Sequence, residues 1–179
     1  FSEVGAGKID SCSNNGQVQG FAGATDDIGV GGITGYLKCG TKHPVTNCYN
    51  AGEIKGSHRK YTGGISGFSK SPNIFYMNAI KYAYNVGKVQ YTEYGTEFYL
   101  ANAICNRNTK SACYLEGTGV SDSAEILTKE EMSYEGAYPF SFGDIWAFED
   151  FEYPVLTNSF CQKFGHDDYE WELQNASTF

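Results

Sequence analysis

The residues that could perform hydrolytic chemistry are few in this chain and do not lie at catalytic spacings. The chain contains three histidines: His43, His58 and His166. None lies four residues from another with a glutamate beside it, as a zinc-peptidase helix requires. A serine or cysteine hydrolase needs a histidine to activate its nucleophile. His43 lies between Cys39 and Cys48, but its place before Pro44 is typical of a loop. We therefore expect no catalytic residue, no metal and no cofactor.

A β-helix polysaccharide lyase or glycosidase is the alternative enzyme class. Such an enzyme uses two carboxylates at a fixed separation, or a carboxylate with Ca²⁺ and a base. Acidic residues such as Asp144 and Glu149 lie in the C-terminal region, away from the repeats described below. Within the repeats, Glu53 is replaced by Gln17 and Lys88 at the equivalent positions. Carboxylates therefore form no column, and we expect a chain that is not an enzyme.

Aromatic residues point instead to a binding surface. Their density rises between Asn73 and Tyr99. Because successive residues of a strand face opposite sides, Tyr82 and Tyr84 would share one face, opposite Ala83. An exposed strip of tyrosines binds sugar rings through apolar contact and hydroxyl hydrogen bonds. The candidate ligand-binding residues are Tyr82, Tyr84, Tyr91 and Tyr94. The alternative is that these rings cover the third repeat against solvent or an insertion.

The charge of the chain limits its partners. The formal net charge is -8, and the pI is about 4.8. Nucleic acids and anionic membranes attract clustered Lys and Arg, so neither is an expected partner. No apolar run approaches the length that spans a bilayer, so we expect no membrane insertion. One short basic segment, Ser57-His58-Arg59-Lys60, could contact an anionic group, or it could be an exposed loop.

The elements that would position these residues are repeats. Intervals of 36 and 35 residues separate equivalent positions of three units. The aligned columns are apolar (Ile9, Val45 and Ile80), small (Cys12, Cys48 and Ala83), asparagine (Asn14, Asn50 and Asn85) and glycine (Gly16, Gly52 and Gly87). Asn and Gly accept positive φ, so the chain is predicted to bend at each Asn-x-Gly corner. Such frequent corners favour strands over helices.

A second pattern, Gly-Gly-Ile-x-Gly-aromatic, occurs around Ile33 and Ile65. The alternation of NCYNAGEIKG with TGGISGF resembles the GLUG-type repeats of exported bacterial surface proteins, including adhesins and non-catalytic regions of immunoglobulin A peptidases. This resemblance covers about Ile9 to Asn106. In the third unit Asn102-Ala103-Ile104 replaces the double glycine, and a fourth trace, ACYLEGTG, has Leu115 where asparagine is expected.

These patterns predict an all-β fold, a parallel β-solenoid of about 36-residue repeats over residues 1–120, in which each unit stacks on its neighbour. Residues 121–156 would form a small aromatic-rich cap, and residues 157–179 a tail or a linker to a further domain. A capping box that begins at Thr128 predicts a brief helix through Met132. Trp146 followed by Tyr153-Pro154-Val155-Leu156 is similar to the segment that often follows such repeats.

The resemblance also implies a function and a location. It implies an extracellular, bacterial surface or secreted protein in which this chain is a non-catalytic interaction or spacer module. The chain starts without Met, so it is either a processed product or a piece of something longer. We expect it to be part of a larger polypeptide. Its partner would be a host protein or a glycan. A carbohydrate-binding module that uses exposed tyrosines is the alternative, followed by the lyase or glycosidase.

Six cysteines raise the question of disulfides. Cys12 and Cys48 occupy equivalent positions two solenoid coils apart, roughly 9.6 Å. That separation exceeds the Cα distance of about 7 Å that a disulfide can bridge. We therefore expect these two to be buried thiols. Cys39 with Cys48, and Cys105 with Cys113, are near enough in sequence to pair at a corner, and the sequence leaves these pairs open.

Overall fold

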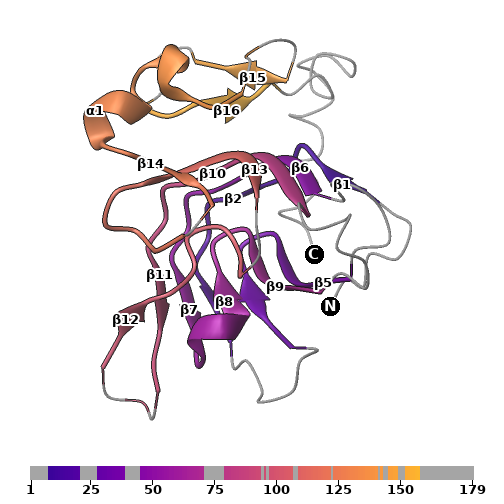
Figure 1. Ribbon diagram of the computed structural model, residues 1–179, viewed down its shortest axis with the longest axis vertical. Coiled ribbons are helices and arrows are strands. Elements are labelled where there is room, and N and C mark those ends of the chain that lie inside the picture. The colour runs from indigo at the N-terminus through magenta and orange to yellow at the C-terminus, as the bar shows by residue number, and fades with distance from the viewer. Residues whose placement is uncertain are drawn as a thin grey trace, which may run out of the picture. The chain divides into compact units, whose positions relative to one another are not determined.

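The structure of the chain is a computed structural model (Figure 1). It describes residues 8–20, 28–38, 45–70, 79–93, 95, 97–106, 109–121, 123–140, 142, 145–148 and 152–157. The chain divides into two compact units, residues 1–141 and residues 142–179. The expectations for Cys39, Tyr94 and the tail beyond residue 157 lie outside the described residues.

The largest sheet of the first unit takes one strand or strand pair from each repeat. Its six strands pair in parallel in the order β1–β6–β10–β13–β14, with β2 also paired to β6. The strands are β1 (Ile9–Asp10), β2 (Ser13–Asn14), β6 (Val45–Asn50), β10 (Ile80–Asn85), β13 (Lys110–Leu115) and β14 (Glu125–Leu127). Segments that lie far apart in the sequence are thus neighbours in space.

The other half of each repeat forms three smaller sheets. A four-stranded sheet has the order β12–β11–β7–β3, and two-stranded parallel sheets join β4 to β8 and β5 to β9. The four-stranded sheet contains β3 (Val18–Gln19), β7 (Ile54–Gly56), β11 (Val89–Tyr91) and β12 (Tyr99–Leu100). The two-stranded sheets contain β4 (Val30–Gly31), β8 (Thr62–Gly63), β5 (Thr34–Lys38) and β9 (Ser66–Lys70). A 3-10 turn, η1 (Arg59–Tyr61), connects β7 to β8.

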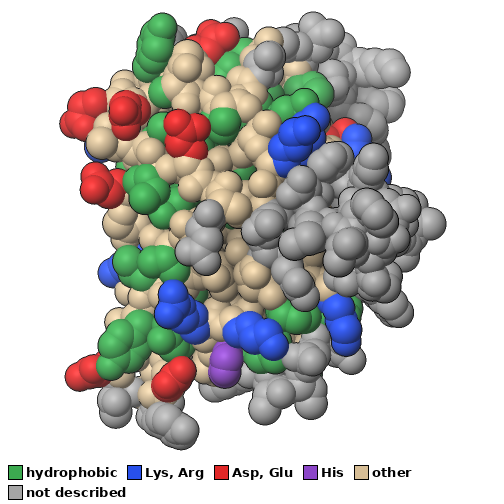
Figure 2. Space-filling view, in the orientation of Figure 1, with side chains coloured by type: hydrophobic (Ala, Val, Ile, Leu, Met, Phe, Trp, Pro, Cys, Tyr) green, Lys and Arg blue, Asp and Glu red, His purple; other side chains and the backbone are tan. Residues whose placement is uncertain are grey.

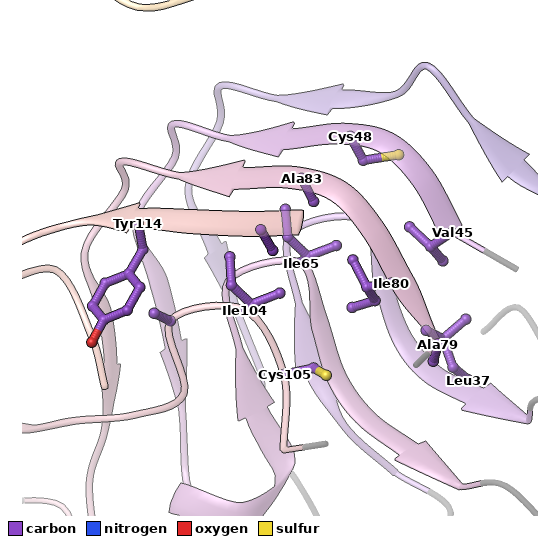
Figure 3. Close-up of a cluster of buried hydrophobic side chains, with 12 residues drawn as sticks. Leu37, Val45, Cys48, Ile65, Ala79, Ile80, Ala83, Ile104, Cys105 and Tyr114 are labelled. Carbon is purple, nitrogen blue, oxygen red and sulfur yellow. The ribbon is translucent and has the colours of Figure 1, made fainter. Parts of the chain in front are cut away.

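The register of the first three repeats confirms the aligned columns. Val45 pairs with Ile9 on one side and with Ile80 on the other. Both Val45 and Ile80 are fully buried in one apolar cluster, against which Ile9 packs. Figure 3 shows the Val45 and Ile80 side chains beside Ile65 and Ile104, which come from the Gly-Gly-Ile pattern and from its replacement in the third unit. The repeats therefore share one apolar interior.

The prediction of a parallel β-solenoid is wrong. The strands divide among five separate sheets, of six, four, two, two and two strands, and do not run as continuous coils. Two pairings, β11 with β12 and the pair in the second unit, are antiparallel. In the third unit the chain reverses after β11. Asn102 stands where the earlier units have a double glycine. Its backbone forms isolated β-bridges with Gly63 and Val120 and is not part of a strand.

The fourth repeat is shifted by one residue from the alignment made on the sequence. Ala112 pairs with Ala83, and Tyr114 pairs with Asn85, so Tyr114 takes the asparagine position assigned to Leu115. A shift of one residue moves every side chain of a strand to the opposite face. Tyr114 accordingly points into the interior (Figure 3), where it is buried in the apolar cluster.

Stacked asparagine side chains connect the repeats at their corners. The Nδ2 group of Asn14 donates to Oδ1 of Asn50 at 2.7 Å, and Nδ2 of Asn50 donates to Oδ1 of Asn85 at 2.7 Å. Asn85 continues to Oγ1 of Thr118 at 3.3 Å. Each asparagine also donates to the carbonyl of the glycine two residues later, at 2.7 to 2.8 Å. Asn50 and Asn85 are fully buried, so these bonds supply the partners that buried amides require.

The asparagine and glycine residues do not serve the purpose that the sequence suggested. The asparagine and the glycine of each Asn-x-Gly corner both lack a positive φ. The described non-glycine residues in the left-handed region are instead Ser11, Asn47, Tyr82 and Ser111. The glycines are needed because the backbones approach closely: a Cβ on Gly52 would overlap the Gly16 carbonyl, and one on Gly87 would overlap the Gly52 carbonyl.

The end of the first unit contains the predicted helix. α1 (Lys129–Met132) begins at Thr128, whose hydroxyl accepts from the Glu131 N–H while the Glu131 side chain accepts from the Thr128 N–H. This capping box is confirmed. A second 3-10 turn, η3 (Glu135–Ala137), follows. Tyr138 then donates its hydroxyl to the Met132 carbonyl at 2.7 Å.

The described residues of the second unit form an antiparallel pair. β15 (Trp146–Ala147) pairs with β16 (Val155–Leu156), and Trp146 lies opposite Leu156. Trp146 is buried. Phe142 and Phe148 lie edge to face with ring centroids 5.8 Å apart. The role of residues 121–156 as a cap stays a prediction.

The asparagine ladder makes a measurable contribution to stability. We expect Asn50→Ala to lower the free energy of unfolding by about 2–4 kcal/mol, because three hydrogen bonds are lost and buried acceptors remain. The exposed Asn15, in the equivalent corner of the first repeat, is the matched control. Asn15→Ala should change the stability by less than about 0.5 kcal/mol. Equal denaturation midpoints for the two variants would contradict a stabilising role for the ladder.

The close approach of the corners predicts a difference between two equivalent glycines. A Cβ on Gly52 meets backbone, whereas a Cβ on Gly16 has only the Asn14 side chain as a neighbour, at 3.7 Å. We expect Gly52→Ala to destabilise the fold by about 1–3 kcal/mol or more, since the repeats must move apart. Gly16→Ala should be nearly neutral. Thermal unfolding of both variants tests this, and a neutral Gly52→Ala would show that the repeats separate freely.

Candidate functional site

Tyr84, the central residue of the expected tyrosine strip, is buried. Its ring is 1% exposed. It stacks on Tyr49 of the preceding repeat, with centroids 5.0 Å apart and an interplanar angle of 2°. Tyr138 packs edge-on against it at 5.8 Å. The expectation of an exposed Tyr84 is therefore wrong, because the segment after α1 covers this face of β10. Tyr84 fits the alternative that the rings cover the third repeat.

Tyr82 lies on the same strand and is partly buried. Phe140 contacts its ring edge-on at 6.4 Å, and the Lys81 ammonium lies 3.9 Å from the ring centroid. Tyr91 belongs to a different sheet, the four-stranded one. The structure thus divides the described candidates between two surfaces, and no single strip contains them.

A pair of tyrosine rings does form on the β11–β12 hairpin. Tyr91 lies opposite Tyr99 in the antiparallel register, and the ring centroids are 5.7 Å apart. Tyr99 is 50% exposed, whereas Tyr91 packs against the cluster that contains Val89 and Tyr61. Sequence reasoning missed Tyr99. The signal that could have identified it is its position shortly after Tyr91 in the same aromatic-rich stretch, close enough in sequence for antiparallel pairing.

The hydroxyl of Tyr99 is held by a neighbouring carboxylate. It donates to Oε2 of Glu97 at 2.6 Å. This hydrogen bond raises the pKa of the Tyr99 phenol, and desolvation and the nearby Tyr91 and Glu93 raise it further. The phenol therefore keeps its proton at physiological pH, so the pair presents a polar, uncharged ring edge beside two carboxylates.

An open depression of about 530 Å³ lies next to this hairpin, and its volume is within the usual range of small-molecule sites. Its lining residues are His58, Arg59, Lys60, Glu93, Asn102 and Asn106. Figure 2 shows Lys, Arg and His side chains gathered in the lower part of one face of the molecule. The depression contains the basic segment noted in the sequence, together with polar residues of the third repeat.

Hydrogen bonds from the third repeat hold the backbone of the basic segment. Nδ2 of Asn102 donates to the carbonyls of Arg59 at 2.8 Å and Thr62 at 2.9 Å. Oγ1 of Thr62 donates to the His58 carbonyl at 2.8 Å. The residue that replaces the double glycine thus fixes η1. This position could not be recognised in the sequence, since it appeared only as a loss of the repeat pattern.

His58 begins this turn and has a defined tautomer. Its Nδ1 accepts from the Lys60 N–H at 3.1 Å, and its ring lies 4.9 Å from that of Tyr61. An imidazole nitrogen that accepts a hydrogen bond carries no proton, so the proton of the neutral ring is on Nε2. His58 can therefore donate one hydrogen bond from Nε2.

The four cysteines that the structure describes are thiols. Cys12, Cys48, Cys105 and Cys113 form no disulfide. Burial raises the pKa of Cys48 to about 12, and it raises that of Cys113 as well. The thiolate is the nucleophile in cysteine chemistry, so neither buried residue is activated for catalysis. The expectation of a buried thiol is confirmed for Cys48. Cys12 is partly buried. The expected separation of two coils between Cys12 and Cys48 is wrong, because Cys12 directly precedes β2, which pairs with β6 in the next repeat.

The described residues form neither a metal-binding group nor a membrane-spanning helix. Over the described residues, no three His, Cys, Asp or Glu side chains gather in a group that could hold a metal ion. Within the same residues, no helix has the length and apolar character needed to cross a membrane. Comparison with known protein families, with curated proteins and with solved structures finds no match to this chain.

The raised thiol pKa values predict low reactivity in the folded state. At pH 8 we expect iodoacetamide to modify Cys48 and Cys113 slowly in the native protein, because almost no thiolate is present. Cys12 should react faster, and peptide mass spectrometry resolves the three sites. The denatured protein at the same pH is the control, in which all three should react. Rapid native labelling of Cys48 would contradict its burial.

The raised pKa of Cys48 makes the free energy of unfolding fall at alkaline pH. The pKa of Cys48 is about 12 in the folded state and about 8.5 in an unfolded chain. Its contribution to stability is therefore complete below about pH 8.5 and is lost as the pH rises toward 12. We expect Cys48→Ala to flatten the alkaline fall in the free energy of unfolding by up to about 1.4 kcal/mol per pH unit.

Proposed function

We propose that this chain is a non-catalytic binding module of a bacterial surface or secreted protein, and that it binds a glycan through Tyr91 and Tyr99. The observation that carries the proposal is the half-exposed ring of Tyr99 beside Tyr91, with Glu97 hydrogen-bonded to its hydroxyl. Aromatic rings offer sugars an apolar face, and their hydroxyls offer hydrogen bonds. Carboxylates such as Glu93 and Glu97 accept hydrogen bonds from sugar hydroxyls.

The hairpin presents these groups from a paired backbone. β11 pairs with β7 in parallel on one side and with β12 in antiparallel on the other. Thr92 N–H donates to the Gly56 carbonyl at 3.1 Å, which extends the pairing beyond β11. Groups on paired strands lose less conformational entropy on binding than groups on free loops. This geometry supports a binding site that exists before the ligand arrives.

The extracellular location and the larger polypeptide rest on the resemblance to GLUG-type repeats. A module of this kind adds recognition to a longer protein, and any catalysis would belong to another domain. The repeats support this role because each strand extends the sheet of the previous unit. They place the hairpin on a stable base.

The proposal predicts that one ring carries the binding. A glycan array with the purified chain identifies a retained oligosaccharide, and calorimetry with that oligosaccharide measures its affinity. We expect Tyr99→Ala to weaken binding by about tenfold, or about 1.4 kcal/mol, since a stacking ring is lost.

Tyr134 is the matched control, because it is 67% exposed and lies in the η3 region. Tyr134→Ala should leave the affinity unchanged. An array on which no glycan is retained would refute the proposal, as would a Tyr99→Ala variant that binds with the affinity of the original chain.

A further inference from the structure

The depression beside η1 is lined by more positive than negative side chains. Arg59 and Lys60 contribute two cations and Glu93 one carboxylate, in a chain whose net charge is -8. The ion pairs between described residues join Lys8 to Asp10 and Lys55 to Glu53, so the exposed Arg59 guanidinium has no carboxylate partner within that part of the chain. A guanidinium binds carboxylate and sulfate groups through paired hydrogen bonds.

Lys60 is held in place before any ligand arrives. Its ammonium lies 5.0 Å from the Tyr61 ring centroid and 5.4 Å from that of Phe68. It also donates to the Tyr61 hydroxyl at 3.3 Å. Cation–π contacts of this kind restrict the lysine side chain, so less rotamer entropy is lost when an anion binds. The ammonium is therefore a fixed positive charge at the edge of the depression.

The remaining lining groups are suited to a polar ligand. His58 can donate from Nε2, as its Nδ1 is already used. Oδ1 of Asn106 accepts from the Ser69 N–H at 2.8 Å, which leaves its NH₂ as a donor. Nδ2 of Asn102 is used by two carbonyls, which leaves Oδ1 as an acceptor. Donors and acceptors around one charged group match an acidic sugar with its hydroxyls.

The depression and the tyrosine pair are close enough for one ligand. Glu93 lines the depression and follows Tyr91 by two residues. The basic segment of the depression directly follows β7, and Tyr99 lies on β12. β12 is two strands away from β7 in the sheet, which corresponds to roughly 10 Å between these two strands. A short oligosaccharide can cover this distance.

We propose that the depression binds the acidic group of an anionic glycan, a carboxylate or a sulfate, while the neighbouring sugar lies on Tyr91 and Tyr99. The inference rests on the proposed glycan binding and adds the class of glycan. Arg59 and Lys60 bind the anion. Glu93 accepts hydrogen bonds from hydroxyls, and its charge disfavours a second acidic group at the same place.

The test uses probes that differ only in the acidic group. Hyaluronan tetrasaccharide and its methyl ester compare a carboxylate with its neutral form. Keratan sulfate tetrasaccharide and its desulfated form do the same for a sulfate. By calorimetry at low salt we expect one acidic probe to bind at least tenfold more tightly than its neutral form. The affinity for the acidic probe should fall as salt is added, because added salt screens the ionic contacts.

The double variant Arg59→Gln and Lys60→Gln should lose this tenfold preference and retain the affinity for the neutral probe. Both side chains are exposed, and circular dichroism with thermal unfolding confirms that the fold is retained. Lys110→Gln, which removes one positive charge at an exposed residue of β13, is the control and should keep the preference.

Three results would overturn the inference. The first is equal affinity for the acidic and neutral probes. The second is a preference for acidic probes that the double variant retains. The third is binding of a tetraglutamate peptide by a chain that binds none of the four sugars. Failure of the proposed function has a different signature, in which Tyr99→Ala binds both members of a probe pair as tightly as the original chain.

Discussion

The stacked asparagine side chains of the repeat corners are the interaction on which the rest of the first unit depends. Each buried amide donates once to the next asparagine or to Thr118 and once to its own corner glycine. One hydrogen of the amide NH₂ group thus holds the corner, and the other joins that corner to the next repeat. The glycine after each asparagine leaves room for the adjacent backbone. The spacing of the repeats follows from these two requirements.

The candidate site occurs where the repeat is interrupted. The first two units pair in register through their double-glycine segments. In the third unit Asn102 occupies this place, and its side chain binds the backbone of the previous unit instead of leaving room for it. The chain before it forms the β11–β12 hairpin, whose edge strand is not constrained by the repeat. Residues there can vary without disturbing the apolar interior.

Two tyrosines of the third repeat differ in exposure because different segments cover them. Tyr84 is enclosed between Tyr49 and Tyr138, because residues after α1 return to this face. Tyr99 lies on an edge strand and remains half exposed. Both are tyrosines of the third repeat, so residue type alone does not separate them. The difference arises from contacts between segments that are far apart in the sequence.

Local chemistry along the chain was enough to predict the repeat interval, the column of Ile9, Val45 and Ile80, and the helix capped by Thr128. It did not determine the division into separate sheets, the register of Tyr114 or the burial of Tyr84. Those depend on which strand ends pair and on which distant segment covers a face. Such choices are made by long-range packing, which a pattern of residue types along one chain does not contain.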